Sequence, residues 1–222
     1  LYAADAAALD QLDAADPGPG YDCPGGPGAA SAQVIAGWVP GTPAYTFPAN
    51  TGIRLEAGKK IAMQIHYNIV TSGSLPDQTA IELQYAKEPV QNEASLYSMS
   101  DHSFAIPPAT TGYSAEARMT VPGNATVWAA APHMHLKGRH TSVNIERQAG
   151  GKDCLIDIPE WDFDWQQFYF LDDPQGMKLD KGDEVVLSCT WDNMSDKTVT
   201  WGDGTEDEMC IAYFYVTAGH AK

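Results

Sequence analysis

The segment Glu184-Val185-Val186-Leu187-Ser188-Cys189-Thr190-Trp191 carries an apolar side chain at every second position, counted from Val185. Successive side chains of an extended strand point to opposite faces, so Val185, Leu187 and Cys189 share one face with Trp191. This pattern predicts a β-strand with one face in a hydrophobic core.

Similar patterns recur along the chain. Strands are predicted at residues 61–68, 81–85, 115–121, 126–131, 141–146 and 209–216. One short helix is indicated, in the Ala- and Asp-rich residues 3–15, and Pro17-Gly18 would stop it. Many short strands without a long helix are typical of an all-β chain built as a β-sandwich. A polar stretch between residues 87 and 100 interrupts the strand pattern, so we place a domain boundary there, giving domains 1–93 and 94–222.

The composition excludes several classes of protein. The 222 residues are 44% hydrophobic, which indicates a folded chain with a core. Thirteen basic and 29 acidic residues give a formal charge of −16, which repels nucleic acid and anionic lipid headgroups. No apolar run reaches the roughly 20 residues that a membrane-spanning helix needs. We therefore expect neither a nucleic-acid partner nor membrane insertion.

The cysteines indicate an oxidising compartment. Cys23, Cys154, Cys189 and Cys210 form no C-x-x-C pair, and an even number of cysteines in such a chain fits one or two disulfides. A secreted or periplasmic location follows. Because the chain starts at Leu1 without a signal peptide, we expect a processed product or a fragment of a longer protein.

The predicted strand 209–216 has one apolar face, which Cys210, Ala212 and Phe214 share with Val216. Cys189 and Cys210 are thus both expected to point into the core, as a buried disulfide requires. Met209 then points away from the core. The acidic run 206–208 is expected to be the exposed start of this strand.

The segment His133-Met134-His135 follows the apolar residues 127–131. Two side chains that are two positions apart in a strand lie on the same face, so the two imidazoles converge. The thioether of Met209 would complete a His₂Met set, and a soft sulfur ligand favours copper, particularly Cu(I). The alternatives are two surface histidines, Met209 as core filler, or a zinc site in which His140 supplies a third imidazole.

The remaining histidines give weaker signals. His66 shares the polar face of its predicted strand with Gln64 and Asn68, where a hydrogen-bonded histidine is the ordinary interpretation. His102 and His220 have no supporting context, so we expect both of them at the surface.

These residues carry a resemblance to the copper type II, ascorbate-dependent monooxygenases. The segment Trp161-Asp-Phe-Asp-Trp165-Gln166 is similar to bacterial members of the family. The other segments that resemble the family are Ile61-Ala-Met-Gln-Ile-His66-Tyr67, Phe104-Ala-Ile-Pro-Pro108, Pro132-His133-Met134-His135-Leu136-Lys137-Gly138 and Gly204-Thr-Glu-Asp-Glu-Met209-Cys210.

The resemblance implies two tandem antiparallel jelly-roll sandwiches with one copper each, of which the N-terminal one is incomplete here. It makes His133, His135 and Met209 the ligands of the catalytic copper, and His66 the third ligand of an electron-transfer copper. It also places Tyr213 against the substrate and Cys210 in a disulfide. The expected reaction is hydroxylation of a C–H bond of a small molecule by O₂, with ascorbate or another one-electron donor.

Two departures from the family pattern matter. The family's first copper also uses a His-His pair upstream of the Cys23 loop, and this chain has no adjacent histidines. Ala131 stands where the peptide-amidating members have an arginine that binds a carboxylate, which argues against a peptide C-terminus as substrate.

We therefore expect a copper-dependent monooxygenase. One alternative is a truncated copper-binding module of a larger secreted assembly, which would need partner subunits or a missing N-terminal segment. The other is a zinc hydrolase that uses His133, His135 and His140.

Overall fold

The computed structural model describes residues 1–39, 42–67, 73 and 75–220. It confirms the all-β prediction, with a single helix among these residues. The N-terminal part contains β1 (Tyr2–Asp5), α1 (Ala6–Ala15), β2 (Gln33–Val34), β3 (Thr51–Ile53) and β4 (Lys59–Ala62). The rest contains β5 (Asn92–Ser100), β6 (Ala105–Ile106), β7 (Thr110–Thr120), β8 (Ala125–His133), β9 (Gly138–Glu146), β10 (Lys152–Ile158), β11 (Tyr169–Phe170), β12 (Met177–Leu179), β13 (Glu184–Asn193), β14 (Val199–Thr200) and β15 (Ile211–Ala218).

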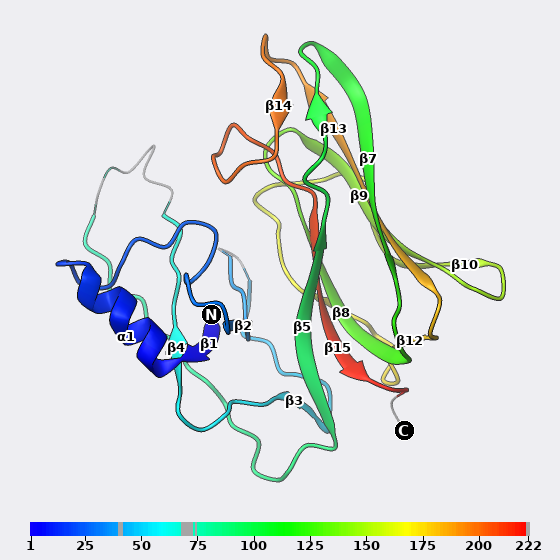
Figure 1. Cartoon of the computed structure of the whole chain (residues 1–222). Helices are drawn as coiled ribbons and strands as arrows, with labels where there is room; N and C mark the ends of the chain where they lie inside the picture. Colours follow the sequence, from blue (N-terminus) through cyan, green and yellow to red (C-terminus); the bar gives the residue numbers. More distant parts are fainter. Residues whose placement is uncertain (40–41, 68–72, 74, 221–222) are drawn as a thin grey trace.

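Two sheets form a sandwich in the C-terminal part (Figure 1). One sheet has the strand order β10-β9-β13-β7, and the other has the order β11-β8-β15-β5-β3, with β12 also paired to β8. All neighbouring strands are antiparallel except β3 and β5. Figure 1 shows β1, α1 and β4 beside this sandwich.

The core lies between the two sheets and follows the predicted alternation. Val185, Leu187, Cys189 and Trp191 of β13 are all at most 3% exposed, and they pack in the same cluster as Phe214 of β15. Further members come from β8, β9 and β15 and from the residues next to β8 and β15: Val127, Ala130, Met134, Val143, Ile145, Cys210 and Ala212. The odd-numbered positions of β13 thus form the core face that its sequence predicts.

The predicted disulfide is present between Cys189 and Cys210, whose Cα atoms are 5.9 Å apart. Both residues are fully buried. Because Cys189 belongs to β13 and Cys210 immediately precedes β15, the bond joins the two sheets. Of the other cysteines, Cys23 is half-buried and Cys154 is exposed, and both are free.

The second sheet also buries residues on its outer face. Trp128, Ala129 and Tyr215 form a smaller cluster there, which is covered by Phe47 and Phe170. The rings of Phe47 and Tyr215 stack at a centroid distance of 4.4 Å. This cluster holds the segment before β3 and the segment around β11 against the outer face of β8 and β15.

The N-terminal part differs from the prediction. The apolar-polar alternation of residues 61–68 produces only the short strand β4, which pairs with β1 over four positions. Beyond it Met63, Ile65 and Tyr67 are 39%, 37% and 54% exposed, and Asn68 lies outside the described residues. The predicted strand at residues 81–85 is also wrong, since this segment has no strand partner in the structure. The alternation predicted a half-buried strand, but the neighbouring β1 is too short to support one.

The polar stretch before residue 100 contains a strand that the sequence analysis missed. β5 pairs with β15 along seven positions and with β3 on its other side. The division of the chain into the domains 1–93 and 94–222 stays a prediction.

The only helix of the described part, α1, has ten residues, and no helix there is long and apolar enough to cross a bilayer.

We expect that replacing Cys189 and Cys210 together by alanine lowers the free energy of unfolding by about 2–5 kcal/mol, because the bond restricts the unfolded chain. Urea denaturation followed by circular dichroism measures this change. Cys154→Ala is the matched control, since Cys154 is free and exposed, and its unfolding curve should match the wild type. Equal stability of the double variant and the wild type would contradict the prediction.

Candidate metal centre

His133 is the last residue of β8, and His135 lies in the turn that follows. His133 pairs with Ile211 of β15, and Ala131 pairs with Tyr213. Met134 between the two histidines is fully buried in the core. The two imidazole rings lie edge to face, with centroids 5.2 Å apart. His133 at the end of β8 therefore lies on the outer face of the second sheet, and the ring of His135 lies beside it, as the spacing predicted.

Hydrogen bonds set the tautomer of both rings. His135 Nδ1 is 3.0 Å from the backbone carbonyl of Asp207, which can only accept, so Nδ1 carries the proton. His133 Nδ1 is 2.5 Å from Gln166 Oε1, while Gln166 Nε2 donates to the carbonyl of Phe163. His133 therefore also donates from Nδ1. Both Nε2 atoms keep a lone pair, which is the arrangement of metal-ligating histidines.

Burial favours the neutral form of His133. Withdrawal of the ring from solvent lowers the pKa of His133 from 6.5 to about 4, and the hydrogen bond to Gln166 opposes this shift. Because the folded-state pKa lies below the ordinary value, the neutral ring contributes stability above pH 6.5, and this contribution is lost as the pH falls towards 4. Protons thus compete little with a metal ion at this ring near neutral pH.

The segment 159–168 packs beside the two histidines. Trp161 donates from Nε1 to the carbonyl of His135 at 3.1 Å, and the ring of Phe163 meets the His135 ring edge-on at 6.1 Å. Gly138 makes this packing possible, because a Cβ atom there would lie 2.5 Å from Trp161 Cδ1. Gln166 of the same segment contacts His133. One segment therefore supports both imidazoles.

Met209 lies two residues before Ile211, the partner of His133. It is half-buried, whereas the adjacent Cys210 is fully buried in the core. Among the described residues, Met209 does not belong to either hydrophobic cluster. Its side chain is therefore not part of the hydrophobic core, and the backbone around Met209 runs beside the histidine turn.

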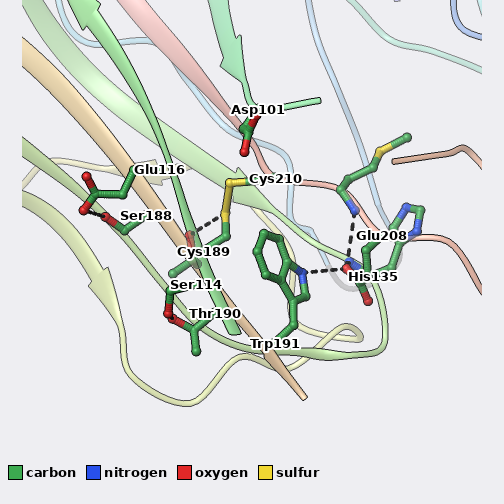
Figure 2. Close-up of a disulfide and its surroundings, with 12 residues drawn as sticks. Asp101, Ser114, Glu116, His135, Ser188, Cys189, Thr190, Trp191, Glu208 and Cys210 are labelled. Carbon is green, nitrogen blue, oxygen red and sulfur yellow. Dashed lines mark hydrogen bonds between the residues drawn. A yellow bond between two sulfur atoms is a disulfide. The ribbon is translucent and has the colours of Figure 1, made fainter. Parts of the chain in front are cut away.

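Glu208 is a functional candidate that the sequence analysis placed wrongly. It was expected to be exposed, but its side chain is fully buried. Its Oε2 accepts from the backbone N–H of His135 at 2.9 Å and from Trp191 Nε1 at 3.0 Å, and its Oε1 accepts from the Lys137 N–H at 2.6 Å. Figure 2 shows Glu208 between His135 and Trp191.

The signal for this burial was present in the sequence. Glu208 has the same parity as Cys210 and Ala212, which form the core face, but the acidic run around it suggested a solvated segment. Burial raises the pKa of Glu208, and the N–H donors of His135 and Lys137 oppose the rise. The supporting residues Gln166 and Asp207 were also missed as partners of the histidines, because their contacts come from distant segments.

The other candidate residues lie elsewhere. His140 Nε2 is 2.6 Å from Asp157 Oδ1 in the first sheet, and His66 is exposed in the segment after β4. The ring of His102 stacks on Trp201 at 3.6 Å. No group of three or more His, Cys, Asp or Glu residues within the described ranges could hold a metal ion.

Tyr213 occupies the outer face of β15 opposite Ala131. It is half-buried, and this burial, with smaller effects of Tyr2 and Asp203, raises the pKa of Tyr213. On the outer face of this sheet, the neutral phenol of Tyr213 and the methyl group of Ala131 thus lie next to His133. No cationic side chain stands at position 131 to bind a carboxylate.

Known proteins share sequence similarity with the part of the chain that contains the two histidines. Residues 93–219, more than half of the chain, match the family described as copper type II ascorbate-dependent monooxygenase, C-terminal domain. This range contains His133, His135 and Met209.

Relatives in vertebrates extend the similarity. DBH-like monooxygenase protein 1 of Gallus gallus is 26% identical over 203 residues, which cover 81% of this chain and 32% of that protein. The human protein of the same name is 25% identical over 201 residues, and DBH-like monooxygenase protein 2 of Mus musculus is 23% identical over 201 residues. The chain spans about a third of the length of these curated relatives.

We expect ¹⁵N NMR of the metal-free protein to show a protonated Nδ1 and an unprotonated Nε2 on both histidines at neutral pH. In Gln166→Leu, His133 should lose this preference because leucine accepts no hydrogen bond, whereas His135 should keep it and serve as the internal control. A proton on Nε2 of His133 in the wild type would show that Gln166 does not set its tautomer.

Proposed function

The chain belongs to the copper type II ascorbate-dependent monooxygenase family, and we propose that His133, His135 and Met209 bind the copper ion at which a C–H bond is hydroxylated. The observation that carries the proposal is the pair of imidazoles whose Nδ1 atoms are both hydrogen-bonded to protein acceptors. This leaves a lone pair on the Nε2 atom of each of two neighbouring rings, beside the segment that contains Met209.

The donor set favours copper over zinc. Two neutral imidazoles suit several metals, but a thioether selects Cu(I) among them. The zinc hydrolase hypothesis needs His140, whose ring is held by Asp157 in the first sheet. No observation favours that hypothesis. When bound, copper would supply one-electron redox chemistry and the activation of O₂.

The residues around the ligands would prepare the site. Gln166 and the Asp207 carbonyl would hold the protons at Nδ1, so that both Nε2 atoms remain available for the metal. Trp161 and Phe163 would cover His135 and limit its access to water. Rigid support of this kind keeps ligands in place when the metal changes its oxidation state.

The substrate is proposed to be a small molecule without a carboxylate at the bound end. Tyr213 would contact it from β15, and Ala131 opposite offers no charge. The ammonium group of the nearby Lys137 lies 3.3 Å from the Glu206 carboxylate, which partly neutralises its charge. The chain's formal charge of −16 also disfavours anionic substrates.

Electron delivery is proposed to involve a second copper with His66 as one ligand, and ascorbate or another one-electron donor. The sequence contains no adjacent histidines that could complete this site. This observation favours a second candidate function, a copper-binding module that works within a larger secreted or periplasmic assembly. A secreted or periplasmic location would also suit the disulfide.

Metal analysis tests the proposal. We expect one copper per chain, lost in His133→Ala and retained in the control His140→Ala, whose ring pairs with Asp157. Met209→Ile should weaken Cu(I) binding by about 10-fold or more and Cu(II) binding much less, because the soft sulfur favours Cu(I). Competition with chromophoric chelators for each oxidation state measures both affinities. Tight zinc binding that is insensitive to Met209→Ile would overturn the copper assignment.

Product analysis separates the two candidate functions. The enzyme proposal predicts hydroxylated product when the copper-loaded chain receives O₂ and ascorbate, at a low rate because the second site is incomplete. The binding-module proposal predicts stable copper binding and no product. Mass spectrometry of candidate amine and neutral substrates, with His133→Ala as the blank, distinguishes these outcomes.

A further inference from the structure

The carboxylate of Glu208 is saturated with hydrogen-bond donors from three separate segments. Oε2 accepts from the N–H of His135 at 2.9 Å, from Trp191 Nε1 at 3.0 Å and from the N–H of Met209 at 3.3 Å. Oε1 accepts from the N–H of Lys137 at 2.6 Å. The donors thus come from the histidine turn, from β13 and from the segment before β15.

In the described part of the chain, no Lys or Arg side chain hydrogen-bonds to this carboxylate. The Lys137 ammonium group is directed to Glu206 instead. A buried carboxylate without a cation is stable only when hydrogen bonds replace its lost hydration. All of these donors are fixed in position by backbone or by a packed indole, so Glu208 and its surroundings form a rigid unit.

Two of the donors belong to proposed metal ligands. The N–H groups of His135 and Met209 meet at the same oxygen atom, although these residues are far apart in the sequence. Trp191 anchors this oxygen to the core, since its indole is fully buried. One carboxylate oxygen therefore connects the backbone of His135 to that of Met209, which directly follows Glu208 in the chain.

We infer that Glu208 is a positioning residue that fixes the thioether of Met209 relative to the imidazole of His135, and thereby sets the preference of the centre for Cu(I) over Cu(II). The inference rests on the proposed ligation by His133, His135 and Met209. Glu208 itself would not bind the metal, because its oxygens are occupied by the four N–H donors.

The Glu208→Gln variant tests this role with little change in volume. An amide has one acceptor oxygen, so its NH₂ group must face at least one of the N–H donors. We expect Cu(I) affinity to fall by about 10-fold to 100-fold, the range for residues that orient ligands, with a smaller change for Cu(II). X-ray absorption of the Cu(I) form should show a weakened or lost copper–sulfur contribution. Glu206→Gln is the matched control, since that carboxylate is 90% exposed, and it should bind like the wild type.

A double-mutant cycle separates positioning from general destabilisation. If Glu208 acts through the thioether, Glu208→Gln should have little further effect on Cu(I) affinity in a Met209→Ile background. Full additivity of the two losses would overturn the inference. So would wild-type Cu(I) affinity and an unchanged copper–sulfur signal in Glu208→Gln.

If Glu208→Gln does not fold, Trp191→Phe is measured in its place, because it removes one donor to Oε2 and touches no proposed ligand. Its Cu(I) affinity should fall relative to Cu(II), and an unchanged ratio would overturn the inference. Failure of the proposed function looks different, since the wild type itself would then lack the copper–sulfur contribution.

Discussion

The buried carboxylate of Glu208 is the interaction on which the geometry of the candidate centre depends. A charged group that has lost its hydration is costly, and four N–H donors offset this cost. The donors can do so only if the histidine turn, β13 and the segment of Met209 hold their places together. The Cys189–Cys210 disulfide restrains two of these three segments independently. The rigidity of the candidate centre is therefore a property of the sandwich core.

Alternation along two strands separates the core from the chemistry. Met134 and Cys210 point into the core, while His133 and Tyr213 lie on the outer face. A slip of one residue in the register of β8 would turn His133 towards the core between the sheets and Met134 away from it. The hydrophobic effect that buries Met134 thus also determines on which face the imidazoles lie. A change in the packing of Met134 would therefore also move the histidines.

The sequence predicted the structure correctly where the alternation of apolar and polar side chains is clear and the strand has long partners. The core face of β13 and the disulfide were predictable because their side chains alternate and both cysteines fall on apolar faces. β5 was missed because its serines and other polar side chains break the pattern, and its pairing with β15 and β3 depends on distant residues. The strand prediction for residues 61–68 was wrong for the opposite reason. The alternation there is clear, but the only strand of the described part that pairs with its first residues is the short β1.

The same distinction applies to the site. The convergence of His133 and His135 follows from their spacing, but their tautomers depend on Gln166 and Asp207, which only the folded chain brings close. Segment 159–168 is itself held by residues before β3: Thr42 donates to the Gln166 carbonyl at 3.3 Å, and the rings of Tyr45 and Phe168 are 6.0 Å apart. The orientation of His133 is therefore connected to the N-terminal part of the chain through Gln166. The segment that contacts both imidazoles thus packs against residues that precede β3, so the surroundings of the proposed ligands include residues from both parts of the chain.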